Sequence, residues 1–130
     1  MCHPFPLTDR LEQTEYLNCV TPVGIAHNGV IALTSDRNNK QYSDTALFIT
    51  RYLVNLVKCP DDLEDKETLR TIEKLAGSKL AILDNWGRVT TIGNFINDKD
   101  LLFSNGSYKP ERFAYSNVNY YPSWHAIYRQ

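Results

Sequence analysis

The sequence predicts an α+β layered domain, and three observations predict it. Short runs rich in β-branched residues come before and after two segments whose apolar residues recur at helical spacing. Turn signals built on Asn and Gly separate the runs. The 130 residues are 42% hydrophobic and 22% charged, which suits one globular domain with a real core. We therefore expect a single domain over residues 1–130, with residues 104–130 as an aromatic-rich tail.

The first strands of this domain are expected before residue 34. Prolines within residues 1–21 favour an irregular lead-in or an edge segment over a central strand. From Val23 to Leu33, β-branched and apolar residues predict two short strands joined by a tight turn at Asn28-Gly29. Asn-Gly is a strong hairpin signal because both central residues of a type I′ turn need positive φ. The polar run "TSDRNNKQY" at residues 34–42 then predicts an exposed loop.

Two helices follow. Ser43 is a good N-cap, and Asp44 suits the positive first turn of a helix that runs towards Cys59-Pro60. Its apolar residues recur at helical spacing: Ala46, Ile49, Tyr52, Leu53, Leu56 and Val57. A second helix begins near Asp65 and ends at Gly77, the expected C-cap. Leu69, Ile72, Leu75 and Ala76 lie on one of its faces.

The remaining strands are expected after residue 78. "KLAILD" (79–84) and "RVTTIG" (88–93) predict an antiparallel hairpin around Asn85-Trp86-Gly87, and "LLFSN" (101–105) predicts one more strand. The tail has no clear period. Its aromatic residues are Tyr108, Phe113, Tyr115, Tyr120, Tyr121, Trp124 and Tyr128. Core packing and a binding surface both fit this composition.

The charge balance limits the partners. Fourteen basic and fifteen acidic residues give a net charge of -1, so we expect neither nucleic acid nor a membrane as a partner. The N-terminus carries no targeting signal, and no apolar run is long enough to span a bilayer. The sequence therefore predicts a soluble, cytoplasmic protein.

The cysteines and histidines do not predict a metal site. Cys2, Cys19 and Cys59 lack CxxC spacing, and their odd number argues against a disulfide framework. We expect reduced thiols, with Cys19 and Cys59 in or near the core. His3, His27 and His125 lack metal-ligand spacing, so we predict no metal and no cofactor.

Five segments in order resemble a class II glutamine amidotransferase domain, which has the N-terminal-nucleophile hydrolase fold. They are "CHPF" (2–5), "GIAHNGVI" (24–31), "SDTALF" (43–48), "KLAILDNWGRVTTIG" (79–93) and "FSNGSY" (103–108). The resemblance covers about residues 2–108. It implies an αββα sandwich, here N-terminally truncated, because "CHPF" is similar to a segment that follows the opening strand of the family.

The resemblance also implies a site for a glutamine-like small molecule. In the family, an Asn side chain and a Gly N–H form the oxyanion hole, which implies that role for Asn28 and Gly29. The Asp that opens the helix contacts the amino-acid head of the substrate, which corresponds to Asp44. His3 would line the pocket, and His27 joins the substrate-binding set by its position. Structural roles remain open as alternatives: a plain hairpin turn for Asn28-Gly29, a structural or turn role for His27, and an acid in the first turn of a helix for Asp44.

The nucleophile implied by the family is an N-terminal cysteine whose own α-amine is the base. Removal of Met1 would leave Cys2 in that chemical state, with an α-amino pKa suited to proton transfer near neutral pH. The two prolines that follow cannot easily supply the central strand that normally presents the thiolate. We therefore expect glutamine amide hydrolysis through Cys2, of impaired activity.

A second class of function remains open. The same fold could serve as a non-catalytic binding or inhibitory protein, such as a phage-encoded protein that binds a host factor. A sandwich without its first strands exposes sheet edges and part of its core. A second copy of the chain, a separate partner protein or the aromatic tail could each cover them, and self-association combined with the tail is the favoured arrangement. We therefore expect a homo-oligomer, in the simplest case a dimer.

Overall fold

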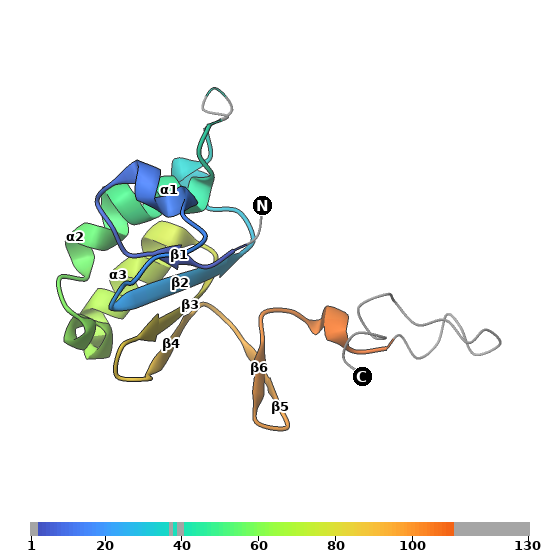
Figure 1. The fold of residues 1–130 in the computed structure, drawn as a ribbon. Helices are drawn as coiled ribbons and strands as arrows, with labels where there is room; N and C mark the ends of the chain where they lie inside the picture. The colour runs from blue at the N-terminus through green and yellow to red at the C-terminus, as the bar shows by residue number, and fades with distance from the viewer. Residues whose placement is uncertain (1–2, 37, 39–40, 111–130) are drawn as a thin grey trace. The chain divides into compact units, whose positions relative to one another are not determined.

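The computed structural model describes residues 3–36, 38 and 41–110, which form an α+β fold (Figure 1). Contacts between residues divide the chain into two compact units, residues 1–94 and 95–130. The strands of the first unit are β1 (Phe5–Pro6), β2 (Val23–Asn28), β3 (Lys79–Asp84) and β4 (Val89–Ile92). Its α-helices are α1 (Asp44–Phe48), α2 (Val54–Leu56) and α3 (Lys66–Ala76). Short 3-10 turns are η1 (Leu11–Glu15), η2 (Ala32–Thr34) and η4 (Pro60–Glu64).

The four strands form one antiparallel sheet in the order β1-β2-β3-β4. Phe5 pairs with Ile25, which in turn pairs with Ile82 of β3. The β1 strand has only two residues and contains Pro6, which cannot donate to a ladder and therefore suits the edge position. The prediction of an edge segment before residue 21 is confirmed.

The predicted hairpin at Asn28-Gly29 is wrong. The chain does not return after Gly29 as a strand that pairs with β2. The two strands that pair with β2 are β1, which precedes it in the chain, and β3, which begins at Lys79. The chain continues into η2, where the Thr34 hydroxyl donates to the Asp44 carbonyl at 2.7 Å. Contacts with the start of α1, and not a local turn, therefore set the path of the chain after Gly29.

The first predicted helix begins at the expected residue. The Ser43 hydroxyl accepts a hydrogen bond from the Ala46 N–H at 3.1 Å, which confirms the N-cap. A π-helical stretch, η3 (Ile49–Leu53), joins α1 to α2, so that helical backbone runs without a break to Leu56. The helix ends before Cys59, where the backbone is already extended.

The second helix and the hairpin that follows it match their predictions. Asp65 caps α3 by accepting from the Thr68 N–H, and Gly77 ends the helix in the left-handed conformation. A left-handed C-cap favours glycine, which has no Cβ to oppose that conformation. The β3 and β4 strands then pair as an antiparallel hairpin.

The core lies between the helices and one face of the sheet. Alternate residues of β2 and β3 point towards the helices. Buried side chains of this core include Ile25, Leu80, Ile82 and Ile92 from the sheet and Phe48, Ile49, Leu53 and Ile72 from the helices. Cys19 and Cys59 are both exposed, so the prediction of core or half-buried thiols is wrong. Each lies in a segment that connects two elements, where the side chain has no core to enter.

The second unit contains a hairpin of β5 (Ile96–Asp98) and β6 (Leu101–Phe103), followed by η5 (Gly106–Tyr108). The strand predicted over 101–105 is present as β6. Nothing in the sequence analysis predicted β5, whose turn residues Lys99 and Asp100 have positive φ without being glycine or asparagine. The Tyr108 ring stacks on Phe103 with centroids 3.7 Å apart, and its hydroxyl donates to Asp98 Oδ2.

Several sequence predictions fall on residues that the structure does not describe. The aromatic residues of the tail beyond 110, His125 and Cys2 lie outside the described residues. Within those that are described, no helix is both long and apolar enough to cross a membrane.

One buried ion pair fixes the tip of the β3–β4 hairpin. The Asp84 side chain, 1% exposed, accepts from the Arg88 Nε at 2.7 Å and from the backbone N–H groups of Trp86 and Arg88. The Arg88 guanidinium also donates to Glu64 and Asp61 near η4, at 2.7 and 3.1 Å. Burial would raise the pKa of Asp84, but the hydrogen bonds and the guanidinium charge outweigh it and hold that pKa below its usual value.

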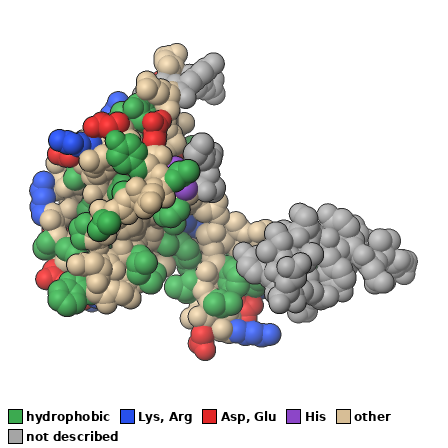
Figure 2. Space-filling model, viewed as in Figure 1, with side chains coloured by type: hydrophobic (Ala, Val, Ile, Leu, Met, Phe, Trp, Pro, Cys, Tyr) green, Lys and Arg blue, Asp and Glu red, His purple; other side chains and the backbone are tan. Residues whose placement is uncertain are grey.

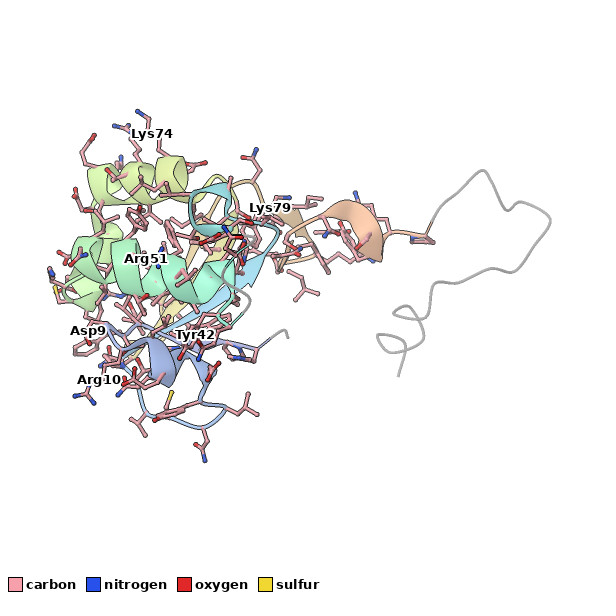
Figure 3. The ribbon with its side chains drawn as sticks, turned by 90° about the horizontal axis from the view of Figure 1, so that it is seen from above. Asp9, Arg10, Tyr42, Arg51, Lys74 and Lys79 are labelled. Carbon is pink, nitrogen blue, oxygen red and sulfur yellow. The ribbon has the colours of Figure 1, made fainter. Side chains whose placement is uncertain are left out.

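We predict that Asp84→Asn destabilises the fold at neutral pH and has less effect near pH 3. A carboxyl whose folded-state pKa is depressed contributes stability above its unfolded pKa and loses it as the pH falls through the folded value. Urea unfolding of both proteins across this range measures the difference. Asp9→Asn, at the exposed position labelled in Figure 3, is the control, because it makes the same substitution outside the buried ion pair and should leave the stability at neutral pH nearly unchanged. An equal loss at both pH values would contradict the assignment.

Candidate functional site

The predicted site residues His27 and Asn28 are the last two residues of β2, and Gly29 follows them at the edge of the sheet where this strand ends. This edge also holds the start of β3, because Asn28 pairs with Lys79 in the antiparallel register. Strand alternation places His27 on the helix-covered face and Asn28 on the opposite face. The side chains of His27 and Asn28 therefore have different surroundings.

His27 joins three elements through its ring. Its Nδ1 lies 2.7 Å from the Thr45 hydroxyl in α1, and its Nε2 lies 2.8 Å from the Ser78 hydroxyl, between α3 and β3. Burial lowers the pKa of His27, and the negative charge of Asp44 only partly opposes this shift. The imidazole is therefore neutral near pH 7, with one ring nitrogen as donor and the other as acceptor.

Asp44 ties the start of α1 to the segment that follows Gly29. Its Oδ2 accepts from the Ile31 N–H at 2.7 Å, and its Oδ1 accepts from the Thr45 N–H at 2.9 Å. An ionised carboxylate offers about four lone-pair positions, so acceptor capacity remains for a further donor. Asp44 is thus a structural acceptor in this fold, and a substrate amine could still approach it.

Gly29 has a φ of +127°, a conformation that favours glycine. A Cβ built at this position would lie 2.5 Å from the Ser78 hydroxyl oxygen and would displace it. Close approach to Ser78, rather than a type I′ turn, therefore explains this glycine.

His3 lies in a cavity of about 340 Å³ between β1, η1 and the residues before α1. Its Nδ1 lies 2.9 Å from the Pro4 carbonyl, and its ring centroid lies 4.5 Å from that of Phe5. Figure 3 labels Tyr42, which lines the same cavity beside η1. Other lining residues are Thr14, Glu15, Gln41, Ser43 and Ala46. The cavity lining does not include Asn28, Gly29 or Asp44.

The structure therefore brings some of the predicted residues together and leaves others apart. His27 and the segment after Asn28-Gly29 contact the start of α1, whereas His3 lines a separate cavity and Cys2 is outside the described residues. Sequence reasoning missed Thr45 and Ser78, which bind the two nitrogens of His27. The sequence offered two signals for them: Thr45 follows Asp44, which opens the predicted helix, and Ser78 follows Gly77, the expected C-cap. Among the described residues, no three His, Cys, Asp or Glu side chains are grouped to hold a metal ion.

Comparison of the chain with family models, curated proteins and solved structures found no match. The interpretation of the site therefore depends on the residues and their geometry.

We predict that Gly29→Ala destabilises the fold by about 1–3 kcal/mol, the usual cost of a strained backbone position. The methyl group would also displace the Ser78 hydroxyl from His27. Gly77→Ala is the matched control, because its φ is also positive but a Cβ there would meet nothing within 4 Å. Thermal or urea unfolding should rank Gly29→Ala as the more destabilising change. Equal losses would show that Ser78 does not restrict this position.

Proposed function

We propose that the chain is a class II glutamine amidotransferase-type domain that acts on a glutamine-like amide with impaired activity. The observation that carries the proposal is that the "HNG" and "SDT" segments meet, although fourteen residues lie between Asn28 and Ser43. Asp44 accepts from the Ile31 N–H at 2.7 Å, and Thr45 binds the His27 ring at 2.7 Å. The resemblance requires these two segments to converge on one substrate.

The proposed chemistry follows from charge development during amide cleavage. Attack on the amide carbonyl places negative charge on its oxygen, and two fixed donors at that oxygen typically contribute several kcal/mol at the transition state. The Asn28 amide and the Gly29 N–H are the proposed donors. The Asn28 side chain is exposed and does not titrate, so it could meet a substrate at any pH.

The finer fold implied by the resemblance, an αββα sandwich, belongs to this proposal. The sheet face that points away from the helices supports this fold. It carries small residues beside two larger apolar ones: Gly24, Ala26 and Ala81, with Leu83 and Val89. Leu83 is 54% exposed and Val89 61% exposed. Figure 2 shows green hydrophobic side chains exposed on the surface that it presents. A sheet with two apolar faces is typical of an inner layer, which a second sheet covers about 10 Å away.

The same face favours the second candidate function, a non-catalytic binding or inhibitory protein. We propose that a second copy of the chain covers it. The small residues of one sheet offer hollows for Leu83 and Val89 of the other, as a two-fold interface requires. Strand alternation places one charged residue, Lys79 at the start of β3, on this described face, and the net charge of -1 per chain gives weak repulsion between copies.

To test the amidotransferase proposal, the chain without Met1 is treated with a glutamine analogue that carries a diazoketone in place of the amide. We expect one slow covalent adduct on Cys2, measured by intact mass and peptide mapping. Asn28→Ala should slow labelling by roughly a hundredfold or more, the usual cost of one oxyanion donor. Cys2→Ser should abolish the adduct.

Two other thiols provide the control for this experiment. Cys19 and Cys59 are exposed, so both compete for any unselective electrophile. Cys19→Ser and Cys59→Ser should leave the adduct yield unchanged. A folded protein without an adduct on Cys2, or with adducts spread over all three thiols, would overturn the amidotransferase proposal and leave the binding protein as the better explanation.

We predict a dimer in light scattering at micromolar concentration, and we predict that Ala81→Glu converts it to a monomer. The new carboxylate would have to be buried unpaired between two apolar faces, which costs more than the interface gains. Thr71→Glu, on an exposed position of α3, adds the same charge and should leave the dimer intact. A monomeric unaltered chain would exclude the second copy as the partner.

A further inference from the structure

Ser78 occupies an unusual position between α3 and β3. It follows the left-handed Gly77 and precedes Lys79, which Figure 3 labels at the start of β3. Its hydroxyl oxygen lies 2.8 Å from His27 Nε2 and donates to the Asn28 carbonyl at 3.3 Å. The imidazole nitrogen is the nearer of these two partners. No sequence pattern predicts a role for this serine.

The His27 ring is held from its far side. Nδ1 lies 2.7 Å from the Thr45 hydroxyl, and that hydroxyl donates to Asp44 Oδ1 over a long 3.5 Å. Both tautomers fit these distances, and the one with the proton on Nδ1 turns the lone pair of Nε2 towards Ser78. In that tautomer Nδ1 donates to Thr45, Thr45 donates to the carboxylate, and Nε2 accepts from Ser78 once the hydroxyl proton turns from the Asn28 carbonyl to the ring. A nucleophile, a base and a group that orients the base are the parts of a hydroxyl-activating site.

Glycines surround Ser78, which is a second observation independent of the hydrogen bonds. Gly29, Gly77 and Gly93 all have positive φ. A Cβ at Gly29 would lie 2.5 Å from the serine oxygen, and one at Gly93 would lie 3.1 Å from the serine carbonyl. Ser78 itself is half-buried, whereas Gly29 beside it is exposed. Glycine at positions 29 and 93 permits the close backbone approach that the placement of Ser78 requires.

We propose that Ser78 is a nucleophile activated by His27, and that this edge of the sheet cleaves small activated acyl esters. Ser78 Oγ forms a bond to the acyl carbon while its proton passes to Nε2. The bond from the acyl carbon to the alcohol oxygen then breaks, and Nε2 returns the proton to the leaving alkoxide. Water attacks the acyl-serine by the same route and releases the carboxylic acid. A small acyl group on a good leaving group suits a serine at a half-buried surface position.

This site goes beyond the proposed amide chemistry, because its nucleophile lies among the described residues and does not involve Cys2. The two proposals share the Asn28-Gly29 segment but predict adducts on different side chains. Each can therefore fail without the other.

A fluorophosphonate ester, which reacts with activated serines, tests the inference on the unaltered chain. We expect a single adduct that peptide mapping places on Ser78, together with an acyl-enzyme burst on p-nitrophenyl acetate. Ser78→Ala should abolish both. His27→Gln should slow labelling roughly a hundredfold, the usual contribution of a general base. Thr45→Val should slow it less, because the base remains in place.

The controls separate a reactive serine from a merely structural one. Ser35→Ala removes an exposed hydroxyl elsewhere and should leave labelling unchanged. Mapping on the unaltered chain does not depend on whether any variant folds, and circular dichroism identifies variants that do not. An unlabelled folded chain, an adduct elsewhere, or an unchanged rate in folded His27→Gln would each overturn the proposal. Labelling of Cys2 by the diazoketone is scored separately and bears only on the amidotransferase proposal.

Discussion

The two hydrogen bonds of the His27 ring are the constraint on which this edge of the sheet depends. They join the end of β2 to α1 through Thr45 and to the residue before β3 through Ser78. A half-buried imidazole without partners would cost the protein the desolvation of both nitrogens. With both partners present, the same ring holds three elements at one point. Both proposed activities require their groups to be held in this way.

The second constraint is the Asp44 carboxylate, which explains why the chain leaves β2 as it does. Its bond to the Ile31 N–H satisfies a backbone donor in a segment that has no strand partner. It also draws this segment towards the start of α1. The conformation of Gly29 follows from that path, because the chain must pass close to Ser78 on its way to α1. A bound substrate amine would share a carboxylate that is already structural.

Local sequence signals predicted much of the fold and less of the site. The Ser43 and Asp65 caps, the Gly77 C-cap and the β3–β4 hairpin depend on short-range chemistry, and each is present. The hairpin expected at Asn28-Gly29 failed, because pairing of β2 with β1 and β3 overrode the local turn preference. The roles of Thr45 and Ser78 were missed because they too depend on contacts between residues far apart in the sequence. Their partnership with His27 spans 18 and 51 residues, and such contacts leave no local periodicity to read.

The two faces of the sheet carry different groups of residues. The helix-covered face carries the core and His27, whereas the opposite face carries Asn28 beside small and exposed apolar residues. Asn28 thus lies at the rim of a surface that another layer would cover. If a second copy packs there, water around the Asn28 amide is reduced and any hydrogen bond that it donates to an oxyanion is strengthened. Dimerisation and amide chemistry would then depend on each other, whereas the Ser78–His27 pair, on the helix side of the sheet, would not require the partner.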